Sequence, residues 1–172
     1  HFSRADQDAY AVETLTRARS AIEAGAFADE IAPIVVGGKG GDRIVDTDEH
    51  PLKVAPEKIP NLKPAFRANG TITAASASAN ADGAAALVLT RRSIAEREGM
   101  PILAEIRAHA THSQEPARYT TAPIPAIRKL LAKAGWSVGD VDLFEINEAF
   151  AVVAMAAARD LGIARERLKD LH

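Results

Sequence analysis

The sequence predicts an α/β fold with a mainly parallel sheet inside a layered structure. After residue 83, apolar runs of strand length alternate with segments of helical periodicity, which is typical of βαβ units. The segment 148–161 is predicted to be a helix that is apolar almost all round, so it must be covered on nearly every side. Such a helix belongs in the middle of a layered protein. We expect this chain to have little left with which to cover it.

The first predicted helix spans 3–24. Ser3 and Asp6 form a capping-box pattern at its start. Gly25 suits the position just after the last turn, where a left-handed backbone conformation commonly ends a helix.

A β-hairpin is predicted next, with strands at 30–36 and 43–46. Pro33 cannot donate to a strand ladder, so the first strand is expected at an edge. The glycine-rich turn 37–42 contains Lys39, but it lacks the Gly-Lys-Ser/Thr order that opens a helix in a phosphate-binding loop. This turn is therefore predicted to be a flexible hairpin tip.

The remaining elements are predicted from apolar runs and from residues that begin and end helices. A Pro-rich stretch at 47–64 predicts a long surface loop. The predicted strands are 84–90, 101–111 and 141–146, and the predicted helices are 91–99, 123–134 and 148–161.

The composition excludes several classes of function. The 172 residues carry 21 Lys+Arg against 23 Asp+Glu, so the chain has no broad basic field for nucleic acid. No apolar run reaches the roughly 18 residues that a membrane helix needs, and no signal peptide follows His1, so we expect a cytoplasmic protein. Without cysteine, the chain can supply no disulfide, thiolate metal site or cysteine nucleophile.

Two histidines could suggest a metal site, but their spacing argues against one. His109 and His112 are three residues apart in a predicted strand, where such a pair faces opposite sides. We therefore predict solvated strand-end histidines and no metal.

Two segments allow either a structural or a functional interpretation. The segment 73–85 is rich in small and hydroxyl residues, which suit a packing turn or a close approach of a ligand to the backbone. In 145–151, a predicted strand meets a predicted helix, where α/β proteins place their sites. Asn147 could cap that helix, or its amide could bind a water or a substrate oxygen.

At these segments the sequence resembles the thiolase family, which includes acetyl-CoA acetyltransferases and 3-ketoacyl-CoA thiolases. Residues 147–150 resemble its NEAF motif, and residues 3–11 resemble its SREEQDxFA helix start. Residues 70–74 and 82–84 resemble its GTVTA…DGA segment, and residues 121–126 resemble its TGPIPA turn. The motifs follow the family's order along nearly the whole chain.

The resemblance implies a layered αβαβα fold built from two similar halves, of which this chain would be an incomplete, internal part. Residues 1–81 would form the loop domain that covers coenzyme A. Residues 82–100 would complete the N-terminal half, and residues 101–172 would begin the C-terminal half. The family's two active-site cysteines would lie outside the chain, and residues 169–172 depart from the family's pattern.

The resemblance also implies an acyl-CoA acyltransferase of fatty acid metabolism, in which a cysteine takes an acyl group from its CoA thioester and passes it on. Acyl-CoA and CoA would be the substrates, no cofactor would be bound covalently, and the whole protein would be a homodimer or homotetramer. This chain alone, lacking cysteine, is expected to be inactive. The alternative is a non-catalytic CoA- or lipid-binding relative. The intact motif at 147–150 argues against it, because such relatives usually carry a histidine-containing sequence there.

The resemblance assigns roles to single residues as well. Asn147 would be catalytic, holding a water that donates to the oxyanion of the enolate. Ser78 would hydrogen-bond the pantetheine, and Phe150 would line the end of the site that holds the acyl group. The coenzyme A groove would further be lined by Leu62, Ala65, Phe66 and Ala74.

Overall fold

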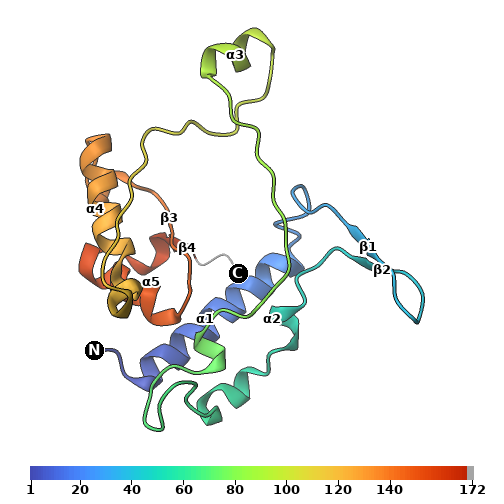
Figure 1. Ribbon diagram of the computed structural model, residues 1–172, viewed down its shortest axis with the longest axis vertical. Helices are drawn as coiled ribbons and strands as arrows, with labels where there is room; N and C mark the ends of the chain where they lie inside the picture. Colours follow the sequence, from blue (N-terminus) through green and yellow to red (C-terminus); the bar gives the residue numbers. More distant parts are fainter. Residues whose placement is uncertain (170–172) are drawn as a thin grey trace. The chain divides into compact units, whose positions relative to one another are not determined.

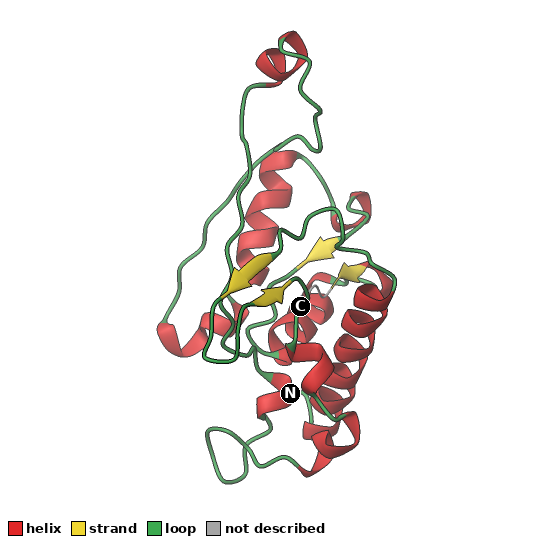
Figure 2. Ribbon diagram, turned by 90° about the vertical axis from the view of Figure 1, so that its right-hand side faces the viewer, coloured by secondary structure: helices red, strands yellow, loops and turns green. Residues whose placement is uncertain are grey.

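The computed structural model describes residues 1–169 (Figure 1). These residues divide into two compact units. The first unit comprises His1–Ala79 together with the chain from Leu143 onward, and the second comprises Asn80–Asp142. Most of the regular structure is helical, and the strands are short (Figure 2). Of the residues 169–172 that depart from the family's pattern, the last three lie outside the described residues.

The first unit is built around one long helix. Its elements in chain order are α1 (Arg4–Glu23), β1 (Ile34–Val36), β2 (Arg43–Val45), α2 (His50–Lys53), the 3₁₀ turns η1 (Pro56–Asn61) and η2 (Ala74–Ser76), β3 (Phe144–Glu145), α5 (Ala151–Leu161), η5 (Arg165–Arg167) and β4 (Leu168–Lys169).

Helix α1 begins and ends where the sequence predicts. The Ser3 hydroxyl accepts a hydrogen bond from the Asp6 N–H at 3.1 Å, and the Asp6 carboxylate accepts one from the Ser3 N–H at 2.8 Å. Gly25 follows the helix with a φ of 67°, which glycine adopts at little cost. The predicted helix and its capping box are therefore confirmed.

The capping box makes part of the stability of α1 depend on pH. The side chain of Ser3 first, and then its backbone N–H, hold the pKa of Asp6 below its ordinary value of 3.8. Because this pKa is lower in the folded state, the contribution is present above the ordinary value and is lost as the pH falls through the folded pKa.

We therefore expect Ser3→Ala to reduce the free energy of unfolding most at neutral pH, and the loss to shrink below about pH 4. Urea unfolding of both chains across this pH range measures the difference. A difference between the two chains that is independent of pH would contradict the expectation.

Helix α5 packs against α1. Residues 151–158 are all buried or half-buried, and Ala154 and Ala157 are 0% exposed. On α1, Tyr10 and Ala11 are among the buried residues. The prediction that this apolar helix must be covered is thus confirmed. The expectation that little of the chain would cover it is wrong, because α1 supplies a long buried face.

The chain after α5 returns to α1 and contacts it through charged groups. The Arg165 guanidinium lies 2.9 Å from the Glu13 carboxylate and 3.7 Å from the centroid of the Tyr10 ring. Arg17 donates a hydrogen bond of 3.1 Å to the Leu168 carbonyl. These contacts join the beginning and the end of the first unit.

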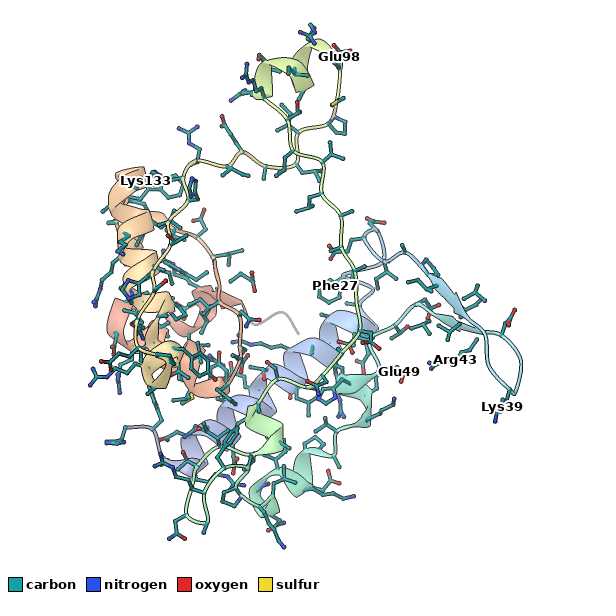
Figure 3. The ribbon with its side chains drawn as sticks, viewed as in Figure 1. Phe27, Lys39, Arg43, Glu49, Glu98 and Lys133 are labelled. Atoms are coloured by element: carbon teal, nitrogen blue, oxygen red, sulfur yellow. The ribbon has the colours of Figure 1, made fainter. Side chains whose placement is uncertain are left out.

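The predicted hairpin is present. Strands β1 and β2 are antiparallel, with Ile34 opposite Val45 and Val36 opposite Arg43. Lys39 lies at the tip of the hairpin (Figure 3), and no helix follows the turn, as expected for a hairpin rather than a phosphate-binding loop. Strand β3 pairs in parallel with β4.

The predicted strands at 84–90 and 101–111 are wrong. Neither segment contains a strand, and Leu87, Val88 and Leu103 are 83%, 89% and 92% exposed. A strand exists only where a neighbour pairs with its backbone groups, and no described segment pairs with these two. Among residues 1–169, parallel pairing is confined to β3 and β4.

The second unit is mainly irregular. Its elements are α3 (Arg92–Arg97), the 3₁₀ turn η3 (Pro116–Thr121), α4 (Pro123–Ala134) and the 3₁₀ turn η4 (Val138–Asp140). The predicted bounds of α4 are confirmed, with Gly135 at its end in the left-handed conformation at a φ of 72°. Among the described residues of both units, no helix combines the length and apolarity required to cross a membrane.

Candidate functional site

The segment between β3 and α5 receives a strand-like contact from a distant part of the chain. The Ser78 hydroxyl donates a hydrogen bond of 2.7 Å to the Glu148 carbonyl, and the Ser78 N–H donates one of 3.2 Å to the Ala149 carbonyl. Ala77 and Phe150 form an antiparallel bridge. The two segments with open interpretations in the sequence therefore lie side by side.

A third segment joins them through an aromatic pair. The Phe66 and Phe150 rings stand edge to face, with centroids 5.9 Å apart and planes at 87°. Such pairs contribute about 0.5–1.5 kcal/mol beyond area burial. Phe66 is 70% exposed, so most of its ring remains available to a ligand.

The segment that leads to Ser78 is ordered by its own side chains. The Ser76 hydroxyl accepts from the Thr73 N–H at 3.0 Å, and the Thr73 hydroxyl accepts from the Ala75 N–H at 3.3 Å. Thr73 and Ser76 are buried, while Ala74 and Ser78 are exposed. The segment is thus a self-capped packing turn whose other face is open to solvent.

Asn147 does not cap the helix that follows it. The N-cap position of α5 is Phe150, three residues later, and no side-chain cap hydrogen bond is made there. Asn147 is exposed, and within residues 1–169 its side-chain amide makes no hydrogen bond. The capping interpretation is therefore wrong, and the amide donors are available to another molecule.

The other predicted groove residues precede this turn. Leu62 is half-buried directly after η1, and Ala65 is exposed. The Ala65 N–H donates a hydrogen bond of 2.9 Å to the Ile72 carbonyl. The structure thus brings Phe66 and Ser78 to the segment 148–150. In the described part of the chain, Leu62, Ala65 and Ala74 form no hydrogen bond with that segment.

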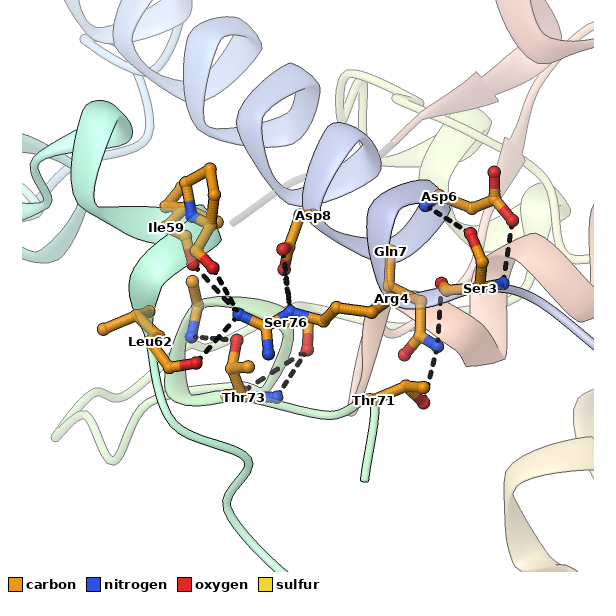
Figure 4. Close-up of polar contacts among 12 residues, drawn as sticks. Ser3, Arg4, Asp6, Gln7, Asp8, Ile59, Leu62, Thr71, Thr73 and Ser76 are labelled. Atoms are coloured by element: carbon orange, nitrogen blue, oxygen red, sulfur yellow. Dashed lines mark hydrogen bonds and ion pairs between the residues drawn. The ribbon is translucent and has the colours of Figure 1, made fainter. Parts of the chain in front are cut away.

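Sequence reasoning missed a buried polar cluster at the start of α1. Gln7 and Asp8 are 2% and 8% exposed, and Arg4 pairs with Asp8 (Figure 4). The signal that could have found it is the spacing of Arg4 and Asp8, four residues apart on one helix face. The cluster contacts the segments that lead to Leu62 and Thr71.

Within residues 1–169, the histidines form no metal cluster. His112 contacts the Gln114 side-chain oxygen at 3.2 Å and the Lys129 amine at 3.2 Å through its two ring nitrogens. Among the described residues, no group of three or more His, Cys, Asp or Glu side chains could hold a metal ion.

The Ser78 hydrogen bond is expected to contribute to stability. Ser78→Ala should lower the free energy of unfolding by about 1 kcal/mol, because the Glu148 carbonyl loses its hydroxyl donor. Urea unfolding measures the change. Ser20→Ala, at an exposed position of α1, is the matched control and should stay within about 0.5 kcal/mol. Equal effects of the two substitutions would contradict the prediction.

Comparison with known protein families matches nearly all of the chain. The model of the thiolase N-terminal domain matches residues 1–93, and that of the thiolase C-terminal domain matches residues 100–170. An acetyl-CoA acetyltransferase of Syntrophomonas wolfei is 45% identical over 162 residues, covering 94% of this chain and 41% of that protein.

Solved structures agree with the family models. The Bacillus anthracis acetyl-CoA acetyltransferase superposes with a TM-score of 0.92 at 41% identity, covering 96% of this chain and 42% of that one. The Acat5 thiolase of Ascaris suum, solved in complex with coenzyme A, has a TM-score of 0.88 at 36% identity, covering 97% and 43%. The chain therefore spans about two fifths of the length of these relatives.

Proposed function

The chain belongs to the thiolase family, and on this premise we propose that it is part of an acyl-CoA acyltransferase of the acetyl-CoA acetyltransferase type. Its α/β fold is part of the thiolase fold. The observation that carries the proposal is the convergence of Ser78 and Phe66 on residues 148–150. Of these residues, Ser78, Phe66 and Phe150 are ones to which the family resemblance assigns coenzyme A contacts.

The proposed binding surface fits a pantetheine chain and an acyl group. Leu62, Ala65 and Ala74 offer aliphatic side chains, and Phe66 and Phe150 offer two aromatic rings. Ser78 offers a hydroxyl that already donates to the Glu148 carbonyl, so its lone pairs remain able to accept from an amide N–H.

Asn147 is proposed as the catalytic residue of this chain. In the reaction, a thiolate attacks the carbonyl carbon of an acyl-CoA, the carbon–sulfur bond to CoA breaks, and CoA leaves as its thiol. Carbon–carbon bond formation then passes through an enolate whose oxyanion needs hydrogen-bond donors. The exposed Asn147 amide supplies two N–H donors that can hold a water at that oxyanion.

These 172 residues contain no cysteine, so the cysteine nucleophile of this reaction would have to lie outside them. We expect the chain by itself to bind CoA but to transfer no acyl group. We also propose that the whole protein is a cytoplasmic homodimer or homotetramer. Within it, residues 1–81, 82–100 and 101–172 would belong to the loop domain, the N-terminal half and the C-terminal half.

The test is a graft of residues 1–168 into the acetyl-CoA acetyltransferase of Syntrophomonas wolfei, in place of the matched segment. Thiolysis of acetoacetyl-CoA by the graft is expected at a rate of the host's order. A folded graft that binds CoA without turnover would contradict the acyltransferase proposal and favour the non-catalytic CoA-binding alternative. A folded graft without CoA binding would contradict both.

A further inference from the structure

We propose that Arg4 and Gln7 are positioning residues, which hold the loop 62–72 in the conformation that receives coenzyme A. The inference rests on the proposed function, because Leu62, Ala65 and Phe66 of this loop are its proposed groove residues. Neither Arg4 nor Gln7 is proposed to contact the ligand.

Arg4 fixes the beginning of the loop. Its Nε donates to the two carboxylate oxygens of Asp8 at 2.8 and 2.7 Å. Its Nη2 donates to the carbonyl oxygens of Ile59 at 3.1 Å, Pro60 at 3.4 Å and Leu62 at 2.9 Å (Figure 4). One side chain on α1 thus binds three carbonyls between Ile59 and Leu62, the first residue of the loop.

The Arg4 contact is protected from water. The Arg4 and Asp8 side chains are 25% and 11% exposed. The planar guanidinium presents several donors in a fixed fork, so it can bind a carboxylate and a row of carbonyls at once. A lysine at this position has the same charge but cannot reproduce that geometry.

Gln7 fixes the end of the loop. It is 2% exposed, and its Nε2 donates to the Thr71 hydroxyl at 2.9 Å, as well as to the Phe2 and Ser3 carbonyls at 3.3 and 3.4 Å. The Ala65 N–H then closes the loop onto the Ile72 carbonyl at 2.9 Å. Both ends of the loop are therefore attached to one turn of α1.

Few apolar side chains of the loop are buried, so packing alone restrains it little. Ala65 is exposed, Phe66 is 70% exposed, and Leu62 is only half-buried. A segment with few buried apolar contacts opens easily unless hydrogen bonds restrain it. A loop that is already restrained binds its ligand more tightly, because it loses little further conformational entropy on binding.

The opposite end of α1 offers a matched control. Arg19 donates to the Pro51 carbonyl at 2.9 Å through Nε and to the Val54 carbonyl at 2.5 Å through Nη2. It therefore also binds carbonyls of a distant segment, but that segment carries no proposed groove residue. Arg4→Lys and Arg19→Lys make the same chemical change at two sites.

The experiment measures two properties of the 172-residue chain and its variants. Hydrogen exchange reports the opening of the Ala65 and Gly70 amides, which donate within the loop. Calorimetric titration with free CoA reports affinity. In Arg4→Lys we expect about tenfold faster exchange of these amides and about tenfold weaker CoA binding, since hydrogen bonds from a charged donor are lost. Arg19→Lys should leave both properties unchanged.

A milder variant keeps the inference testable if Arg4→Lys fails to fold. Thr71→Val removes only the hydroxyl that Gln7 binds, while Gln7 keeps its contacts to Phe2 and Ser3. It should weaken CoA binding by several-fold and speed exchange of the Gly70 amide, with unchanged unfolding of the rest of the unit.

The outcomes separate this inference from the proposed function. Two results would overturn the positioning role alone. In the first, Arg4→Lys and Arg19→Lys weaken CoA binding equally. In the second, neither Arg4→Lys nor Thr71→Val weakens CoA binding. An unaltered chain that binds no CoA would overturn the proposed binding function, and the positioning role with it.

Discussion

Replacing Asn147 with alanine in the grafted acyltransferase is expected to lower kcat by about 10²–10³, the usual cost of removing one donor to an oxyanion. The KM for the acyl-CoA should change little, because the donor acts on charge that develops only in the transition state. The structure supports this role, since Asn147 is exposed and makes no side-chain hydrogen bond within residues 1–169. Thiolysis of acetoacetyl-CoA under saturating substrate measures the loss.

Two further variants test whether the amide donors matter. Asn147→Asp keeps the volume of the side chain but lacks N–H donors, so it should lose at least as much activity as Asn147→Ala. Asn61→Ala, at an exposed position at the end of η1, should leave kcat unchanged. An Asn147→Ala graft that turns over at the unaltered rate would remove Asn147 from the mechanism.

Replacing Ile59 with alanine is expected to destabilise the first unit by about 2–5 kcal/mol, the usual cost of truncating a buried isoleucine. Ile59 is 2% exposed and lies in η1, which contacts α1. Its carbonyl also accepts from Arg4, so a cavity beside η1 would loosen the start of the loop that carries Phe66. Urea unfolding measures the loss in stability, and CoA titration measures the accompanying loss in affinity.

Ile34→Ala is the control for this substitution. Ile34 is 60% exposed on the hairpin, so the same truncation there should change stability by no more than about 0.5 kcal/mol. If Ile59→Ala and Ile34→Ala lower the free energy of unfolding by the same amount, η1 is not part of the core of this unit. The structural basis of the loop restraint would then be lost.

Elements with local signals were predicted well from the sequence. Ser3 and Asp6 mark the start of α1 because a capping box is completed within four residues of chain. Gly135 marks the end of α4 for the same kind of reason, since one residue adopts the left-handed conformation there. The hairpin was also predicted, because a short turn brings its own strands together.

Strands without a local partner could not be predicted in the same way. The segments 84–90 and 101–111 have the apolar character of buried strands, yet no described segment pairs with them. Apolar character shows that a segment suits a sheet. Whether a ladder forms depends on a neighbour that the segment's own residues do not specify.

The sequence by itself determined the family, through the order of short motifs such as residues 147–150, and it named Asn147, Phe66 and Ser78 as candidates. Only the tertiary structure decided that Phe66 and Ser78 reach the segment 148–150. Ser78 reaches the Glu148 carbonyl across 70 residues of chain, and Arg4 reaches the Leu62 carbonyl across 58. Contacts at such separations follow from how helices and turns pack against one another, and residue type alone does not specify that packing.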